Sequence, residues 1–341
     1  MEIEIRQLDK SSLPDQLAVY RAAFNPTKGY DENREMWVKK HYENPTGDSL
    51  VFGAYCNGKL AGMNSYMPME YAYQGKTIPM LQSCESGVMP EFQGKGIWSK
   101  VVRYAIDYIL RETKYQAVIG FPNYINSYPG FKKMGWETLF EMENFVMINS
   151  SAVFANSVFK NKSKFFRLIG RLGFLQRIGI ALCGYCSGKY KIEECGDEDL
   201  IWGDKEDVLS VTHNNDLIDW KRRYKGIKTI AIKKGDKILA TCIYSLSDYV
   251  GAKLVKLETC CVAADAFISL KVATALFCKY LLKQHPDAAF VRVWAMPQSE
   301  WAKALKGLLF VKSSHPNPFI IKQNGDTFSK MKWDLSFFDL D

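Results

Sequence analysis

The ten residues from 88 to 97, Val-Met-Pro-Glu-Phe-Gln-Gly-Lys-Gly-Ile, constrain the fold of this chain more than any other stretch. They follow a β-rich run over 77–88 and precede an amphipathic helical pattern over 99–111. A strand, a short glycine-rich loop and a helix start together form a device that binds phosphate groups. The first N–H groups of a helix have no intrahelical partner and lie at the positive end of the helix dipole. The pattern therefore predicts an anion site at residues 93–99.

Gly94 and Gly96 let the backbone approach an anion without a Cβ in the way, and Lys95 between them offers a charge-assisted contact. A dinucleotide-binding or P-loop interpretation fits worse. There is no Gly-x-Gly-x-x-Gly, and Lys95 is not followed by Ser or Thr. A plain strand-to-helix connection with no ligand remains the structural alternative.

With its flanking residues, the loop resembles the acyl-CoA pyrophosphate loop of GNAT (GCN5-related) N-acetyltransferases. That family reads Gln/Arg-x-x-Gly-x-Gly/Ala; Gln93 and Gly96 match it, whereas Trp98 stands at the last, small position. The resemblance implies acetyl-CoA as acyl donor, and no metal. It implies cofactor-binding roles for Val88, Met89, Gln93, Gly94, Lys95, Gly96, Ile97, Trp98, Ser99 and Asn123.

A second stretch supports the same resemblance. Residues 117–120 read as a buried strand, and the residues after Asn123 read as a short helix closed by Gly135. The family's ending, Phe-Tyr-x-Lys-Leu-Gly-Phe, would place its thiolate-protonating Tyr at Phe131, which has no hydroxyl. Tyr128 is the predicted substitute as general acid, with Tyr124 as the alternative.

The chemistry expected of such an enzyme is direct attack of an amine on the thioester, with both substrates bound. Backbone N–H groups at Val88 and Met89 suit the oxyanion. Glu85 is the candidate base, acting directly or through water, and Ser83 is a weaker alternative. A salt-bridged glutamate with no catalytic role is the competing interpretation.

At 341 residues, 47% of them apolar, the chain is long enough for two packed domains. The order of strands and helices, including a hairpin at Asn57-Gly58, recurs in the second half, but the equivalent loop, 262–265, has no glycine and carries Asp265. The predicted class is α/β (α+β), with two GNAT-like mixed-sheet domains in tandem. The predicted boundaries are a CoA-binding catalytic domain at 1–148, a basic helical linker at 149–200 and a second domain without a CoA loop at 201–341.

The net charge of +8 is concentrated between residues 144 and 192, where eight basic residues occur and no acidic one. Lys160, Lys164, Arg167 and Arg171 follow helical spacing and predict one basic helix face. A solvated face, or one paired with the acidic stretch 193–207, is the simpler interpretation. Contact with an anionic membrane or an acidic partner is the alternative, and nucleic acid is not expected.

Nine cysteines, several of them in apolar runs, predict reduced, buried thiols. Cys183 and Cys186 form a lone Cys-x-x-Cys without a second pair, so no metal site is predicted. The start of the sequence has no apolar signal region, and no run is long enough to span a bilayer; we expect a cytoplasmic protein.

The leading functional hypothesis is an acyl-CoA-dependent N-acyltransferase for a small or carbohydrate-linked primary amine, with that acceptor held between the two halves. A Fem-type aminoacyl transferase also pairs two GNAT folds but lacks the Gln-x-x-Gly loop. A non-catalytic CoA-binding or scaffold protein is compatible with Phe131 and Trp98 at their positions.

Overall fold

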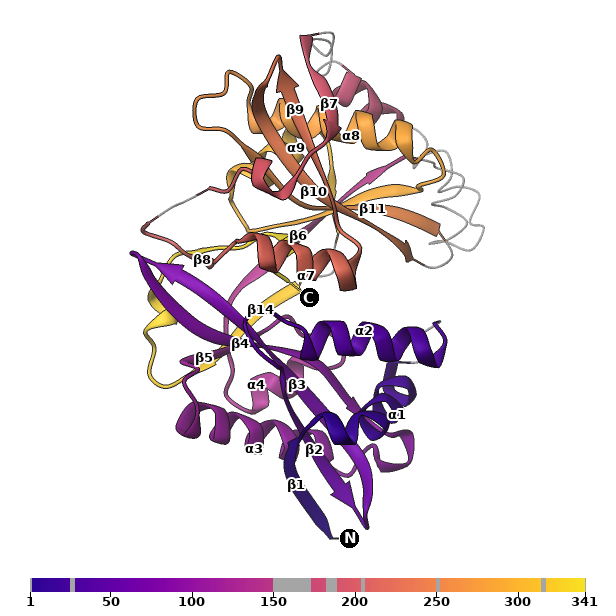
Figure 1. Cartoon of the computed structure of the whole chain (residues 1–341), viewed down its shortest axis with the longest axis vertical. Coiled ribbons are helices and arrows are strands. Elements are labelled where there is room, and N and C mark those ends of the chain that lie inside the picture. Colours follow the sequence, from indigo (N-terminus) through magenta and orange to yellow (C-terminus); the bar gives the residue numbers. More distant parts are fainter. Residues whose placement is uncertain are drawn as a thin grey trace.

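The computed structural model describes residues 2–24, 28–149, 173–181, 189–203, 206–249, 252–313 and 317–340. Two α/β domains share one mixed sheet, in the order β1-β2-β3-β4-β5-β14-β6-β12-β11-β10-β9-β7 among the described residues. Figure 1 shows the N-terminal domain in the lower half and the second domain above it.

The first domain follows the expected order of strands and helices. Its hairpin turn, Asn57-Gly58, has positive φ at both residues, as a two-residue turn between twisted strands requires. Its elements are β1 (Ile3–Leu8), α1 (Leu13–Phe24), α2 (Tyr30–Tyr42), β2 (Leu50–Cys56), β3 (Lys59–Tyr73), β4 (Lys76–Val88), α3 (Ile97–Glu112), β5 (Ala117–Gly120), α4 (Tyr128–Lys133) and β6 (Glu137–Ile148).

The second domain repeats this order, with three antiparallel strands, a helix, a parallel strand and a helix. Its elements are β7 (Lys191–Glu194), β8 (Leu209–Val211), α7 (Asn215–Lys225), β9 (Lys228–Lys234), β10 (Lys237–Tyr249), β11 (Ala252–Val262), α8 (Leu270–Gln284), β12 (Phe290–Ala295), α9 (Glu300–Gly307), β13 (Val311–Lys312), β14 (Asn317–Gln323) and β15 (Trp333–Asp334).

Strand β14 belongs by position to the sheet of the first domain. It pairs antiparallel with β5 on one side and with the first half of β6 on the other, and the second half of β6 pairs with β12. In Figure 1 the yellow β14 lies among the purple strands of the lower half. Side chains of β14 alternate between two cores: Ile320 packs on the α3 side, and Phe319 and Ile321 on the other. One sheet therefore continues across the predicted domain boundaries at 148 and 201. The boundaries themselves stay a prediction.

Helix α7 joins the domains on the other side by packing on α2 (Figure 1). Trp220 is fully buried, and its indole N–H donates to the backbone oxygen of Lys39 at 2.7 Å. Arg223 pairs with Glu43 at 2.9 Å. The end of α2 is thus held by the second domain.

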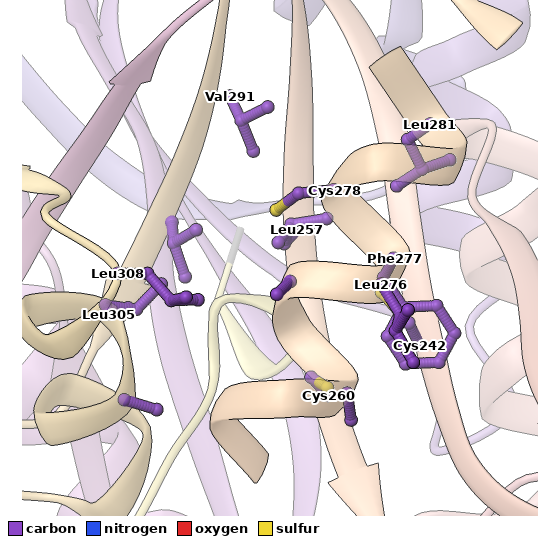
Figure 2. Close-up of a cluster of buried hydrophobic side chains, with 14 of the residues drawn as sticks. Cys242, Leu257, Cys260, Leu276, Phe277, Cys278, Leu281, Val291, Leu305 and Leu308 are labelled. Carbon is purple, nitrogen blue, oxygen red and sulfur yellow. The ribbon is translucent and has the colours of Figure 1, made fainter. Parts of the chain in front are cut away.

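The second core lies between the sheet and helices α8 and α9. Figure 2 shows Cys242, Cys260 and Cys278 among its leucine, valine and phenylalanine side chains. Burial raises the pKa of all three thiols, so they are protonated and apolar in character. All seven described cysteines are free.

Several sequence predictions lie outside the described residues. These are the basic helix face formed by Lys160, Lys164, Arg167 and Arg171, and the pair Cys183 and Cys186. No helix in the described part of the chain is long and apolar enough to cross a membrane.

Candidate functional site

The candidate site lies where the first sheet opens between β4 and β5. The two strands pair in parallel as far as Ser83 and Gly120. β5 ends at Gly120, whereas β4 continues five residues further to Val88. A fork between parallel strands exposes backbone and side chains at their carboxyl ends, where α/β proteins place their ligands.

A β-bulge in β4 shapes this fork. Asn64 of β3 pairs with Ser86 and Tyr66 pairs with Ser83, so Cys84 and Glu85 together face one residue of the neighbouring strand. A bulge bends its strand and redirects side chains. Here it directs Glu85 into the protein beside the fork.

Two adjoining cavities fill the fork. One, of about 380 Å³, lies along the glycine-rich loop; the other, of about 300 Å³, lies between β4 and the residues after β5. Ser86 and Ser127 line both cavities, so the two adjoin each other. Together they extend from the loop to Glu85, and the pair is called the cleft below.

Seven of the ten predicted cofactor-binding residues line the first cavity: Val88, Gln93, Gly94, Gly96, Ile97, Trp98 and Ser99. Asn123 lines the second, and its side-chain oxygen accepts from the backbone N–H groups of Ile125 and Asn126 at 3.0 and 3.1 Å. Met89 and Lys95 line neither cavity. The Met89 N–H donates to Ala61 at 2.9 Å, and the Lys95 ammonium donates to the backbone oxygen of Glu91 at 2.9 Å.

The loop has the backbone that anion binding requires. Gly94 and Gly96 have φ of 76° and 72°, in the left-handed region that glycine adopts without strain. Gly96 is the N-cap of α3, and the N–H of Lys100 is the first to bond within the helix, to Gly96. The N–H groups of residues 97–99 therefore lie at the positive end of α3, beside the cavity.

Trp98, the residue that departs from the family pattern, forms a wall of the cleft. Its indole N–H donates to the Ser86 hydroxyl at 2.6 Å, and its ring packs edge-on against Phe131 at 5.0 Å. A Cβ at Gly130 would lie only 2.3 Å from the Trp98 ring. Gly130 thus makes room for the large side chain of Trp98.

Tyr128 lies beside the cleft without lining either cavity. Its hydroxyl is 3.0 Å from that of Thr138, and its ring stacks on Tyr124 at 5.5 Å. Its neighbour Ser127 is the residue that borders both cavities.

Glu85 forms a buried charge cluster with α2. Its carboxylate pairs with the Lys40 ammonium, lies 3.1 Å from His41 Nε2 and accepts from the Ser65 hydroxyl at 3.0 Å. Burial raises the pKa of Glu85, but the charges of Lys40 and His41 outweigh burial and hold that pKa well below its usual range. Glu85 is therefore an anion at neutral pH, and 14% of its side chain is exposed, toward the second cavity.

The sequence did not indicate Lys40 and His41. They lie more than forty residues before Glu85, on a mostly polar helix whose sequence marks no clear apolar face. Their only visible signal is a run of three basic residues, 39–41, in the last turn of that helix.

The same group of residues recurs in the second domain. There, Glu258 occupies the extra position of a bulge in β11, pairs with Lys225 of α7 at 3.2 Å and accepts from Ser245 of β10 at 2.5 Å. The Glu258 side chain has no exposed surface. Both domains thus bury a lysine–glutamate–serine group at the same place, but only Glu85 reaches a cavity of the fork.

In the described part of the chain, no group of three or more His, Cys, Asp or Glu side chains could hold a metal ion.

Comparison with known proteins agrees with this geometry. Residues 4–139 match a family model described as an acetyltransferase (GNAT) domain. No curated protein sequence is significantly similar to the chain.

Solved structures extend the likeness to both halves. A GCN5-related N-acetyltransferase from Anabaena variabilis is 11% identical, with a TM-score of 0.59, and the match covers 94% of this chain and 73% of that one. A tandem GNAT protein from the clavulanic acid biosynthesis pathway is 10% identical, with a TM-score of 0.58, over 95% of this chain and 99% of that one. N-myristoyltransferase of Saccharomyces cerevisiae, solved with bound myristoyl-CoA, is 10% identical, with a TM-score of 0.58, over 95% and 79%.

Residues 4–139 are thus a GNAT acetyltransferase domain, and the whole chain has the fold of two GNAT-like domains in tandem, which confirms the predicted fold class. Its fold is that of acyl-CoA-dependent N-acyltransferases.

The buried pair predicts how stability depends on charge and pH. Lys40→Met leaves the Glu85 carboxylate buried with too little compensation, and we expect a loss of about 3–5 kcal/mol at pH 7. In the parent, the low pKa of folded Glu85 stabilises the fold above the unfolded pKa, and that contribution is lost as pH falls through the folded value. In the variant, the unpaired Glu85 carboxylate destabilises the fold, and protonation of that carboxylate removes the destabilisation.

The difference between parent and variant should therefore shrink as pH falls below about 4.5, the ordinary glutamate value. Urea denaturation at several pH values measures it. Lys39→Met is the matched control, because among the described residues the Lys39 ammonium pairs only with the exposed Glu35, at 2.6 Å, and we expect a change below about 0.5 kcal/mol. Equal losses for the two variants would contradict the account.

Proposed function

We propose that this protein transfers an acetyl group from acetyl-CoA to a primary amine, by direct attack of the amine on the thioester while both are bound. One observation carries the proposal: a glycine-rich helix N-terminus and a buried carboxylate, Glu85, line two adjoining cavities in the β4–β5 fork. Pyrophosphate at one end would bring the thioester toward the other.

The donor is proposed to lie along the first cavity. Its pyrophosphate would receive the N–H groups of residues 97–99, with Gly94 and Gly96 permitting close approach. Trp98 and Val88 would flank the rest of the cofactor. Lys95 lies outside the cavity wall, so its proposed contribution is long-range charge.

Glu85 is proposed as the group that accepts the proton of the attacking amine, through water. A carboxylate with a lowered pKa is a weak base, but it is fully ionised at neutral pH and attracts an ammonium group. Glu258 supports this assignment by contrast, since the matching cluster without a glycine-rich loop keeps its carboxylate completely covered.

Tyr128 is proposed to return a proton to the departing thiolate. To reach the cofactor, the Tyr128 hydroxyl would have to leave its contact with Thr138, which requires movement of this one side chain beside Ser127. The acceptor is proposed to be a small or carbohydrate-linked amine held between the two domains. The described thiols are all free, which suits the cytoplasmic location we propose.

The donor site is tested by Gly96→Asp. A carboxylate at the N-cap of α3 would repel pyrophosphate, and we expect acetyl-CoA affinity to fall by about a hundredfold or more, measured by calorimetry. Gly226→Asp is the matched control. Gly226 also has a left-handed φ, of 67°, and an added Cβ would meet open space, but this glycine ends α7 in the second domain. Unchanged affinity in the Gly96 variant, or equal losses in both, would reject the assignment.

The base is tested by the double variant Lys40→Met/Glu85→Gln. Removing both charges should restore most of the stability that Lys40→Met alone loses, because neither the Glu85 carboxylate nor the Lys40 ammonium is then left buried without the other. Acetyl-CoA affinity should persist, whereas kcat should fall by about a hundredfold or more in a thiol-release assay with a panel of amines. A stable double variant with parental kcat would remove Glu85 from the chemistry.

Tyr128→Phe separates the proposed acid from its neighbour. We expect kcat to fall by about a hundredfold, with little change in the KM for acetyl-CoA. Ser127→Ala, which removes the hydroxyl that borders both cavities, should leave kcat near the parental value. The opposite pattern would assign the proton to Ser127. CoA binding without turnover of any amine by the parent would instead favour a non-catalytic CoA-binding protein.

A further inference from the structure

The second domain contains a fork like that of the first. β11 and β12 pair in parallel from Leu254 and Phe290 to Leu257 and Val293, and β11 then continues to Val262 paired only with β10 among the described strands. A cavity of about 1050 Å³ lies in this fork, bordered by the end of β11 and by residues 296–301, which follow β12. It is as large as the cavities that hold small-molecule ligands.

This cavity is not built for CoA. The loop after β11 has no glycine, and its Asp265 pairs with Lys237 at 2.6 Å in place of a phosphate cradle. An acidic side chain at that position disfavours pyrophosphate. The second domain therefore has the fork between parallel strands but lacks a phosphate-binding loop beside it.

A histidine held by a buried aspartate lines the cavity. His213 Nε2 is 2.6 Å from Asp339 Oδ1, and its ring stacks on Trp202 at 3.9 Å. Asp339 is 2% exposed, and its other oxygen accepts from the backbone N–H and the hydroxyl of Ser336 at 2.6 and 2.9 Å. With Nε2 bound to the carboxylate and the ring fixed on Trp202, Nδ1 is left as the atom that can contact a ligand.

Two further polar groups at the cavity have no partner in the described part of the chain. They are the hydroxyl of Thr212 and the indole N–H of Trp301, and both atoms are buried. A buried donor without a partner is destabilising. A ligand with hydroxyl or carbonyl oxygens would satisfy both once a small side-chain rotation brings these atoms to the cavity surface.

The cavity wall is aromatic and close to neutral. Trp202, Trp301 and Trp333 all line it. Of its charged groups, Asp339 is paired with His213, and Glu300 is paired with Lys303 at 2.6 Å, outside the cavity. Lys332 and Asp334, which also line the cavity, are opposite in sign. Such a wall disfavours a highly charged ligand and suits one with apolar C–H faces and many hydroxyls.

We propose that the β11–β12 cavity binds a neutral, hydroxyl-rich ligand of the saccharide class, with Thr212, Trp301 and His213 as its hydrogen-bonding residues. The site is separate from the acetyl-CoA cleft and does not depend on acyl transfer. The duplicated domain thus retains a ligand site at its fork with a changed ligand class.

The test is titration of the full chain with neutral monosaccharides and disaccharides, including glucose, galactose and N-acetylglucosamine, followed by calorimetry and ligand-observed NMR. We expect at least one sugar to bind with a Kd below about 10 mM. Trp301→Phe and Thr212→Val, which remove only the donors, should each weaken that sugar by about threefold to tenfold.

Two controls keep the result specific. Trp294→Phe removes another buried, unpartnered indole N–H, but Trp294 does not line the cavity, so sugar affinity should not change. In the free protein, Trp301→Phe and Thr212→Val break no hydrogen bond of the described residues, so neither should lower the urea midpoint appreciably. Acetyl-CoA affinity, measured on the same samples, should stay at the parental value in all three variants.

The proposal is overturned if no sugar of the panel binds below about 10 mM, or if a charged amine such as spermidine binds the cavity and neutral sugars do not. It is also overturned if Trp294→Phe weakens the sugar as much as Trp301→Phe. Failure of acetyl-CoA to bind the parent would reject the donor site while leaving the sugar result to stand alone.

Discussion

Strand β14 is the constraint on which the candidate site depends. Residues 317–323 supply the neighbour on one side of β5, and β5 forms one arm of the fork that holds the cleft. Ile320 enters the core beneath α3, the helix whose N-terminus faces the proposed donor. A four-residue strand such as β5 has few hydrogen bonds of its own, so its position is fixed by the partners on both sides. The last part of the chain therefore sets the geometry of a site whose residues lie in the first part.

The second organising feature is a pair of buried charge clusters related by the duplication. In each cluster, a glutamate at a bulge forms an ion pair with a lysine from the preceding helix and accepts a hydrogen bond from a serine of the adjacent strand. The two sets are Glu85 with Lys40 and Ser65, and Glu258 with Lys225 and Ser245. Replacing a buried ion pair with apolar residues is often no less stable, so stability alone is a weak reason for two such clusters. They fix how a helix sits on a bulged strand, and in the first domain the same carboxylate also reaches a cavity.

The two forks show how one architecture supports different ligand chemistry. In the first, Gly94 and Gly96 open the backbone to an anion, and the two adjoining cavities have volumes of about 380 and 300 Å³. In the second, Asp265 closes off that possibility, while tryptophans and a His213–Asp339 pair line a much larger cavity. The strands and their splay are similar; the loop and the segments packed over the fork decide what each one accommodates.

The sequence by itself determined the local elements and the site they carry. The Asn57-Gly58 turn, the strand–loop–helix at residues 88–97 and the recurrence of the same order after residue 227 were legible because turn chemistry, glycine conformation and hydrophobic periodicity are local properties. Seven of the ten proposed cofactor contacts gather on one cavity for the same reason, since all seven lie between residues 88 and 99, in one strand end, loop and helix start.

Only the tertiary structure decided which distant groups meet. Lys40 and His41 reach Glu85, Gly130 makes room for Trp98, and His213 reaches Asp339 across more than a hundred residues. The insertion of β14 into the sheet of the first domain has no local sequence signature either. The free edge of a strand can pair with any strand of suitable pattern and length. Pairing between segments depends on the free energy of the whole packed sheet, and no window of sequence contains that quantity.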